Sequence, residues 1–147
     1  AEAIVHYQRA LEINPDYTET NFNFGLLLVQ LGRFDEAVPR LQQVLKIRPN
    51  DIEAHLNLGV ALAHQGQDDA AIGHYRKVLE IDPRYAPAHN NLGNILLRLG
   101  RFDQAVVHYQ AAVDIDPNDA EYQHTVRVCL QELGKGQKAD VSKAAEK

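Results

Sequence analysis

Apolar residues recur along this chain with the spacing of amphipathic helices. Over residues 55–63 they fall on more than one side of a helix, which predicts a helix buried on two faces. Over residues 71–79 they fall at i, i+1, i+4, i+7 and i+8, which predicts a second helix with a single buried face. Gly66 and the acidic pair Asp68–Asp69 separate the two segments, as expected for a helix end followed by a helix start. No segment alternates with period two over a useful length, so the sequence predicts no strands.

This two-helix pattern repeats every 34 residues. Four prolines keep that step, each closing a similar tail such as EINP or EIDP: Pro15, Pro49, Pro83 and Pro117. The phrase LGRFDEAV at 31–38 returns almost unchanged as LGRFDQAV at 99–106, two periods later. Because the phrase falls between two predicted helices, it is interpreted as a turn and not as a site for chemistry.

Small residues keep the same register. Gly25, Gly59 and Gly93 recur in the first helix of each pair, and Ala37, Ala71 and Ala105 recur early in the second. Such positions indicate that the two helices cross closely, where a larger side chain would cost about 1–3 kcal/mol through overpacking. A hairpin this short cannot bury its own apolar face, so the repeats are expected to stack on one another.

A 34-residue two-helix unit with Leu-Gly in the first helix, Ala early in the second, an aromatic residue four positions later and a final Pro resembles the tetratricopeptide repeat. The resemblance covers residues 1–134 and implies an all-α, right-handed α-solenoid of stacked antiparallel helix pairs. The family's aromatic residue near the start of the first helix is replaced here by Asn21, His55 and His89.

The register divides the chain into units. Three are complete and two are partial: 1–17, the second helix of a truncated repeat; 18–51, 52–85 and 86–119, full repeats; 120–134, the first helix of a terminal half-repeat; and 135–147, a tail expected to be a short helix or disordered. Because the first unit lacks its first helix, we expect a segment of a longer protein, or ends covered by a second copy.

Composition narrows the class of partner. The net charge of −5, with acidic and basic residues interleaved, gives no basic patch for nucleic acid. The longest apolar run, Leu26–Val29, is far too short for a membrane span, and no secretory signal is evident. A single cysteine, Cys129, excludes an internal disulfide and favours a cytoplasmic location.

The resemblance implies that the first helices line a concave groove that holds an extended peptide or a partner helix. Asn23, Asn57 and Asn91 lie one period apart in this groove, similar to the asparagine ladder in the repeats of the O-linked N-acetylglucosamine transferase. An amide can hold a peptide backbone whatever its side chains, since it offers two donors and an acceptor. The alternative is that these asparagines bond locally within their own helices.

The predicted groove is uneven in polarity. Its N-terminal half is apolar and its C-terminal half is polar, with these inward residues beside the ladder: Phe22, Leu26, Leu56, Val60 and His64, then Asn90, Asn94 and Arg98. We therefore expect a ligand with an apolar segment at one end, unless preceding repeats cover the apolar patch. The basic clamp that binds acidic chaperone tails in one TPR subclass is not matched, because only one of its positions fits in either of two alignments, Asn57 in the first and Asn91 in the second.

No constellation for catalysis or for a cofactor stands out. There is no phosphate-binding glycine loop and no nucleophile with a partnered base, and Cys129 occupies a small core position of its repeat. Seven histidines raise the question of a metal site, but equivalent positions in successive repeats lie too far apart to share one ion. The sequence therefore predicts no metal and no enzyme activity.

The prediction is a protein–protein interaction scaffold that binds a protein or peptide. Two alternatives remain: the targeting segment of a larger enzyme such as a glycosyltransferase, or a self-assembling homo-oligomer that joins through its uncapped ends.

Overall fold

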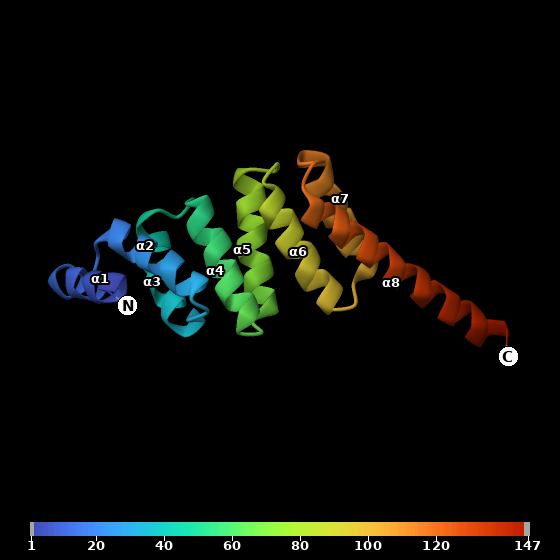
Figure 1. Cartoon of the computed structure of the whole chain (residues 1–147), viewed down its shortest axis with the longest axis horizontal. Helices are drawn as coiled ribbons and strands as arrows, with labels where there is room; N and C mark the ends of the chain where they lie inside the picture. Colours follow the sequence, from blue (N-terminus) through green and yellow to red (C-terminus); the bar gives the residue numbers. More distant parts are fainter. Residues whose placement is uncertain (1, 146–147) are drawn as a thin grey trace. The chain divides into compact units, whose positions relative to one another are not determined.

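The computed structural model describes the backbone of residues 2–145 and the side chains of residues 2–134, and its secondary structure is entirely helical in that range (Figure 1). This confirms the all-α prediction. The helices are α1 (Glu2–Ile13), α2 (Thr18–Gln30), α3 (Phe34–Ile47), α4 (Ile52–His64), α5 (Asp68–Ile81), α6 (Ala86–Arg98), α7 (Phe102–Ile115) and α8 (Ala120–Ala145).

The helices form two compact units, Ala1–Pro83 with α1–α5 and Arg84–Lys147 with α6–α8. In the first unit α2 pairs with α3 and α4 pairs with α5, while α3 and α2 both contact α4. In the second unit α6 pairs with α7, and α7 packs against α8. Each pair is a helical hairpin joined by a short turn, as the 34-residue pattern predicts.

A glycine with positive φ makes each hairpin turn. Gly32, Gly66 and Gly100 have φ of 70°, 74° and 72°, a conformation that other residues adopt only at a steric cost. The following residue closes the turn by donating its backbone N–H to the last turn of the first helix, as Arg33 does to Leu28 at 2.9 Å. The phrase LGRFDEAV is thus a structural joint, as predicted.

The first helices carry glycines where a large side chain of the second helix lies against their backbone. A Cβ added at Gly59 would lie 2.5 Å from Tyr75, and one added at Gly93 would lie 2.7 Å from Tyr109. The close crossing predicted from the sequence is confirmed. At these two positions the side chain nearest the glycine is a buried tyrosine ring, and not the alanine that recurs early in the second helix.

One local expectation differs from the structure. Gly134 was expected to end the last helix, but α8 continues through it to Ala145, and its φ is not positive. Gly32, Gly66 and Gly100 are each followed two residues later by Phe-Asp or Asp-Asp and then by Ala, whereas Gly134 is followed by Lys-Gly-Gln-Lys, which lacks this acidic helix start. Pro39 lies in the second turn of α3, which begins at Phe34.

Candidate functional site

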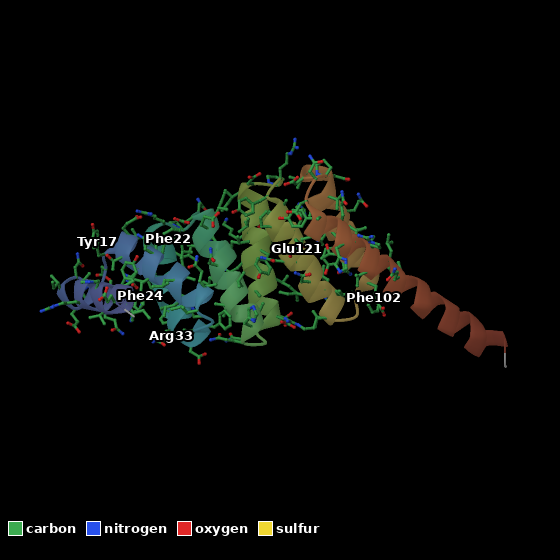
Figure 2. The ribbon with its side chains drawn as sticks, viewed as in Figure 1. Tyr17, Phe22, Phe24, Arg33, Phe102 and Glu121 are labelled. Atoms are coloured by element: carbon green, nitrogen blue, oxygen red, sulfur yellow. The ribbon has the colours of Figure 1, made fainter. Side chains whose placement is uncertain are left out.

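The first unit presents partly exposed apolar residues on two adjacent helices. Phe22 and Leu26 on α2, and Leu56 and Val60 on α4, are neither buried nor fully exposed, and α2 contacts α4. Phe24 faces another way: it is 3% exposed and its ring stacks on Tyr7 of α1 at 5.5 Å, so Phe22 and Phe24 serve different surfaces (Figure 2). The predicted apolar residues therefore lie at equivalent positions of neighbouring helices.

The ladder residues of this unit, Asn23 and Asn57, are both half-buried. The Nδ2 of Asn57 donates to the backbone carbonyl of Glu53 at 2.8 Å, one turn earlier in α4. This is the local bond named as the alternative in the sequence analysis. It uses one of the two N–H groups of the amide, and the geometry keeps the side chain of Asn57 fixed against its helix.

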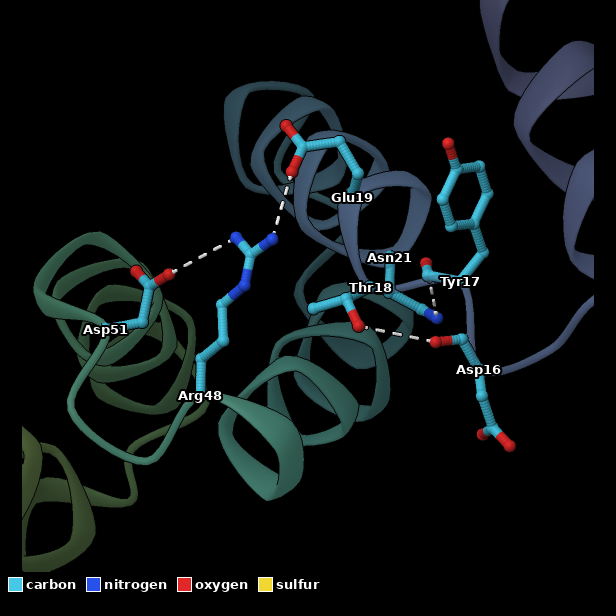
Figure 3. Close-up of polar contacts among 7 residues, drawn as sticks. All are labelled: Asp16, Tyr17, Thr18, Glu19, Asn21, Arg48 and Asp51. Carbon is cyan, nitrogen blue, oxygen red and sulfur yellow. Dashed lines mark hydrogen bonds and ion pairs between the residues drawn. The ribbon is translucent and has the colours of Figure 1, made fainter.

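Arg48, which follows α3, links the starts of α2 and α4. Its guanidinium lies 3.4 Å from the Glu19 carboxylate and 3.9 Å from that of Asp51 (Figure 3). Asp51 also caps α4, because its Oδ1 accepts a hydrogen bond from the Ala54 N–H at 3.0 Å. The ion pairs are partly exposed and contribute about 0–1 kcal/mol each, so their main effect is to offset the negative charge of Glu19 at this edge.

The predicted polar residues of the second unit lie in different environments. Asn91 is half-buried, while Asn94 and Arg98 are exposed. The hydroxyl of Tyr109 donates to Asn94 Oδ1 at 2.7 Å, and burial raises the pKa of Tyr109 to about 12, so this donor keeps its proton. Tyr109 therefore fixes the orientation of the Asn94 amide.

Asn90 is only 5% exposed, and its Oδ1 lies 3.4 Å from the Thr125 hydroxyl of α8, whose hydrogen it shares with the Tyr122 carbonyl at 2.9 Å. The structure thus places this residue between α6 and α8. Its polarity satisfies a contact between helices, which a count of inward positions in the sequence did not reveal.

His64 lies at the edge of the first unit. Its ring is stacked on Phe34 with centroids 4.3 Å apart and planes 6° from parallel. The two rings border a pocket of about 460 Å³ whose other lining residues belong to the α2–α3 turn, the start of α3 and Gln65. The structure therefore associates His64 with the turn that contains Gly32.

Each of two hairpins contains a pair of histidines in direct contact. His55 of α4 and His74 of α5 face each other with 2.8 Å between their Nδ1 atoms, and His89 of α6 and His108 of α7 do so at 3.1 Å. Sequence reasoning compared histidines one repeat apart and missed these pairs. The available signal was a common spacing of 19 residues, which joins the first and second helices of one hairpin.

Near the start of the first helix, where the family usually has an aromatic residue, this chain has polar side chains that contact the carbonyl of a preceding proline. Asn21 Nδ2 donates to the Pro15 carbonyl at 2.8 Å, and Gln123 Nε2 donates to the Pro117 carbonyl at 2.7 Å. His55 Nε2 lies 3.0 Å from the equivalent carbonyl of Pro49. A carbonyl only accepts, so His55 carries its proton on Nε2 and its Nδ1 accepts from the Nδ1–H of His74. Burial, followed by the neighbouring His55, lowers the pKa of His74.

Models of the tetratricopeptide repeat match this sequence over residues 22–86 and 62–127, and a third TPR model matches residues 1–32. This chain belongs to the tetratricopeptide repeat (TPR) family. The TPR matches together run from residue 1 to residue 127, which agrees with the hairpins described above. A search of curated proteins finds no match to this TPR chain.

Solved TPR structures share the fold. A crystal structure of MamA is 24% identical, with a TM-score of 0.83 over 95% of this chain and 81% of that chain. MamA residues 41-end from Desulfovibrio magneticus RS-1 is 21% identical, with a TM-score of 0.75 over 80% of this chain and 66% of that one. YrrB, described as a TPR protein with an unusual peptide-binding site, is 27% identical, with a TM-score of 0.80 over 84% and 64%.

Two further features bear on the chemistry of this TPR chain. Cys129 is fully buried, as predicted, and burial raises the pKa of its thiol, which disfavours the reactive thiolate. None of the helices, within the part of the chain that the structure describes, is long and apolar enough to cross a membrane.

Proposed function

We propose that this chain is a protein–protein interaction module that binds an extended peptide or a partner helix along the first helices of its hairpins. The observation that carries the proposal is the set of four apolar side chains of α2 and α4 that the fold leaves partly exposed: Phe22, Leu26, Leu56 and Val60. Partly exposed apolar residues at equivalent positions of adjacent helices favour an apolar partner surface. Membership of the TPR family supports the same function.

In this proposal the asparagines hold the backbone of the bound peptide. Asn57 already uses one N–H on Glu53, so its second N–H and its Oδ1 would contact the ligand. Asn23 and Asn91 occupy the equivalent positions of α2 and α6, and both are half-buried. In the second unit, Asn94 and Arg98 add an amide and a positive charge on α6, which favour a polar ligand segment there.

The two remaining residues of the predicted groove act differently. Asn90 would influence binding through the contact between α6 and α8 and not by touching the ligand. His64 would contribute only to a ligand long enough to reach the α2–α3 turn.

The test starts from peptides selected by display on the full chain, with their affinities measured by fluorescence anisotropy. Replacing both Asn57 and Asn91 with Ala should weaken binding at least tenfold, which corresponds to about 1.4 kcal/mol. Gln42→Ala, which removes an exposed amide from α3, is the matched control and should leave the affinity unchanged.

Equal affinities for the double variant and the unsubstituted chain would refute the role of the asparagines. Circular dichroism of both variants tests whether they keep their helices. A molar mass that rises with concentration in light scattering, with no peptide selected, would instead favour self-assembly.

A further inference from the structure

His55 of α4 and His74 of α5 join the two helices of one hairpin through an N–H···N hydrogen bond. Their Nδ1 atoms are 2.8 Å apart, and their ring centroids are 5.1 Å apart. His55 Nε2 lies 3.0 Å from the Pro49 carbonyl, which only accepts, so His55 holds its proton on Nε2 and its Nδ1 accepts from the Nδ1–H of His74. The pair thus connects α5, α4 and the loop that precedes α4.

This arrangement has little room for added protons. In the neutral pair, the Nε2 of His74 is the one nitrogen outside the two bonds, so a first proton enters there and leaves the N–H···N bond in place. A second proton must enter at the Nδ1 of His55, which removes the acceptor and sets two N–H groups and two positive charges against each other. His55 is 8% exposed and His74 is half-buried, so water compensates for this charge only in part.

We propose that the His55–His74 pair is a pH-sensitive contact that closes the α4–α5 hairpin at neutral pH and releases it more readily in mildly acidic solution. The proposal rests on the geometry of the pair, in which one hydrogen bond between two helices depends on a nitrogen that acid protonates. It concerns the stability of this hairpin and is independent of what the chain binds.

The direction of the pH dependence follows from proton linkage. Burial, followed by the neighbouring His55, lowers the pKa of His74 from its ordinary value of 6.5. The open hairpin therefore binds more protons than the closed one once the pH falls below 6.5, so the stabilisation is complete above that pH and is lost as the pH falls further. One proton taken up only on opening raises the opening constant by at most about tenfold per pH unit.

Charged groups on the surrounding helices have contacts of their own. One turn from the pair lie Asp51, the N-cap of α4, and Lys77 of α5. α4 also packs on α2 and α3. The contacts of these groups and of the charged side chains of α2 and α3 are as follows: Asp51 with Arg48, Lys77 with Glu80, Glu19 with Arg48, Asp35 with Gln65, Glu36 with Arg33, and Arg40 and Lys46 around a pocket beside Asp16. His55 is thus the titratable group that lowers the pKa of His74.

The α2–α3 hairpin of the same unit is a counterpart that does not titrate in this range. It has Asn21 and Arg40 at the positions of His55 and His74. Asn21 Nδ2 donates to the Pro15 carbonyl at 2.8 Å, as His55 does to Pro49. An amide has no proton to gain near neutral pH, and a guanidinium keeps its charge throughout, so this hairpin should stay closed in acid.

The experiment measures hydrogen exchange of the full chain by mass spectrometry at pH 7.5 and 5.5, with protection factors corrected for intrinsic rates. Protection of peptides from α4 and α5 should fall by about two- to tenfold at the lower pH, and that of peptides from α3 should fall less. The double variant His55→Asn/His74→Arg, which copies the α2–α3 residues, should lose this pH dependence. The control, His6→Gln, removes an exposed histidine of α1 and should keep it.

A second measurement needs no substitution in the pair. Nitrogen-15 NMR of the imidazoles in the unsubstituted chain follows protonation directly. We expect His74 to be protonated on Nδ1 alone at pH 7.5 and to gain its second proton below pH 6.5, while the Nδ1 of His55 still accepts.

Two results would overturn the proposal. One is an equal pH dependence of α4 and α5 protection in the unsubstituted chain and in the folded double variant. The other, which decides alone if the double variant does not fold, is a His74 imidazole that titrates at or above pH 6.5, as a solvated histidine does.

Discussion

The glycines of the first helices show how one missing side chain fixes the distance between two helices. Gly59 and Gly73 both lie within helices, but only Gly59 faces a neighbour, the ring of Tyr75. Tyr75 is 2% exposed and has little freedom to move away. Around Gly73 there is open space. The same substitution should therefore have opposite effects at the two positions.

We expect Gly59→Ala to lower the free energy of unfolding, because overpacking against Tyr75 costs about 1–3 kcal/mol and exceeds the gain of about 1 kcal/mol in helix propensity. Gly73→Ala should raise the free energy of unfolding by about 0.5–1 kcal/mol, since it gains propensity without a clash. Urea denaturation of both variants measures the difference. A stabilising Gly59→Ala would contradict the close packing of α4 and α5.

At the scale of single residues, the sequence predicts the positions of the turn and crossing glycines well, but it predicts poorly which side chains contact one another. The turn glycines and the crossing glycines follow from a periodic pattern that the backbone itself requires. The burial of Asn90 and the contact of His55 with His74 depend on the angle at which two helices meet, which periodicity does not specify. Residues that contact within one hairpin are also hidden when only equivalent positions of different repeats are compared.

At the scale of the helix, the last glycine of the series behaves differently from the others. Gly100 joins α6 to α7 with φ of 72°, whereas Gly134 lies inside α8 with helical φ. Both follow a Leu in the sequence, so the glycine alone did not determine the outcome. What differs is the next segment: after Gly100 comes a helix start that packs back on α6, and after Gly134 there is none.

This difference predicts opposite effects of one substitution at two positions. Gly100→Ala should destabilise the protein by about 1–2 kcal/mol, because a Cβ disfavours the left-handed conformation. Gly134→Ala should be neutral or stabilising by up to about 1 kcal/mol, because Ala is the better residue in a helix. Thermal unfolding followed by circular dichroism compares the two variants. If Gly134→Ala lowered the stability as much as Gly100→Ala, Gly134 would lie in a turn, and α8 would not be continuous through it.

Across the whole molecule, burial is distributed unevenly among the helices. Of the described residues in α1, Leu11 alone is buried. In the same unit α4 buries side chains on more than one face, including Leu58, Ala61 and Leu62. In repeat proteins each element is stabilised chiefly by its immediate neighbours, so an element with one neighbour opens at a lower free energy than one packed on two sides.

Hydrogen exchange should therefore vary along the first unit in the order of burial. We expect the amides of α4 to exchange slowest and those of α1 fastest, because α4 contacts α2, α3 and α5, while α1 packs on α2. Hydrogen exchange is measured by mass spectrometry on the full chain, at a pH where intrinsic rates are known, and the exchange of peptides from α1 is compared with that of peptides from α4. Equal protection of α1 and α4 would mean that the unit opens only as a whole, with the single buried residue of α1 as firmly held as the core of α4.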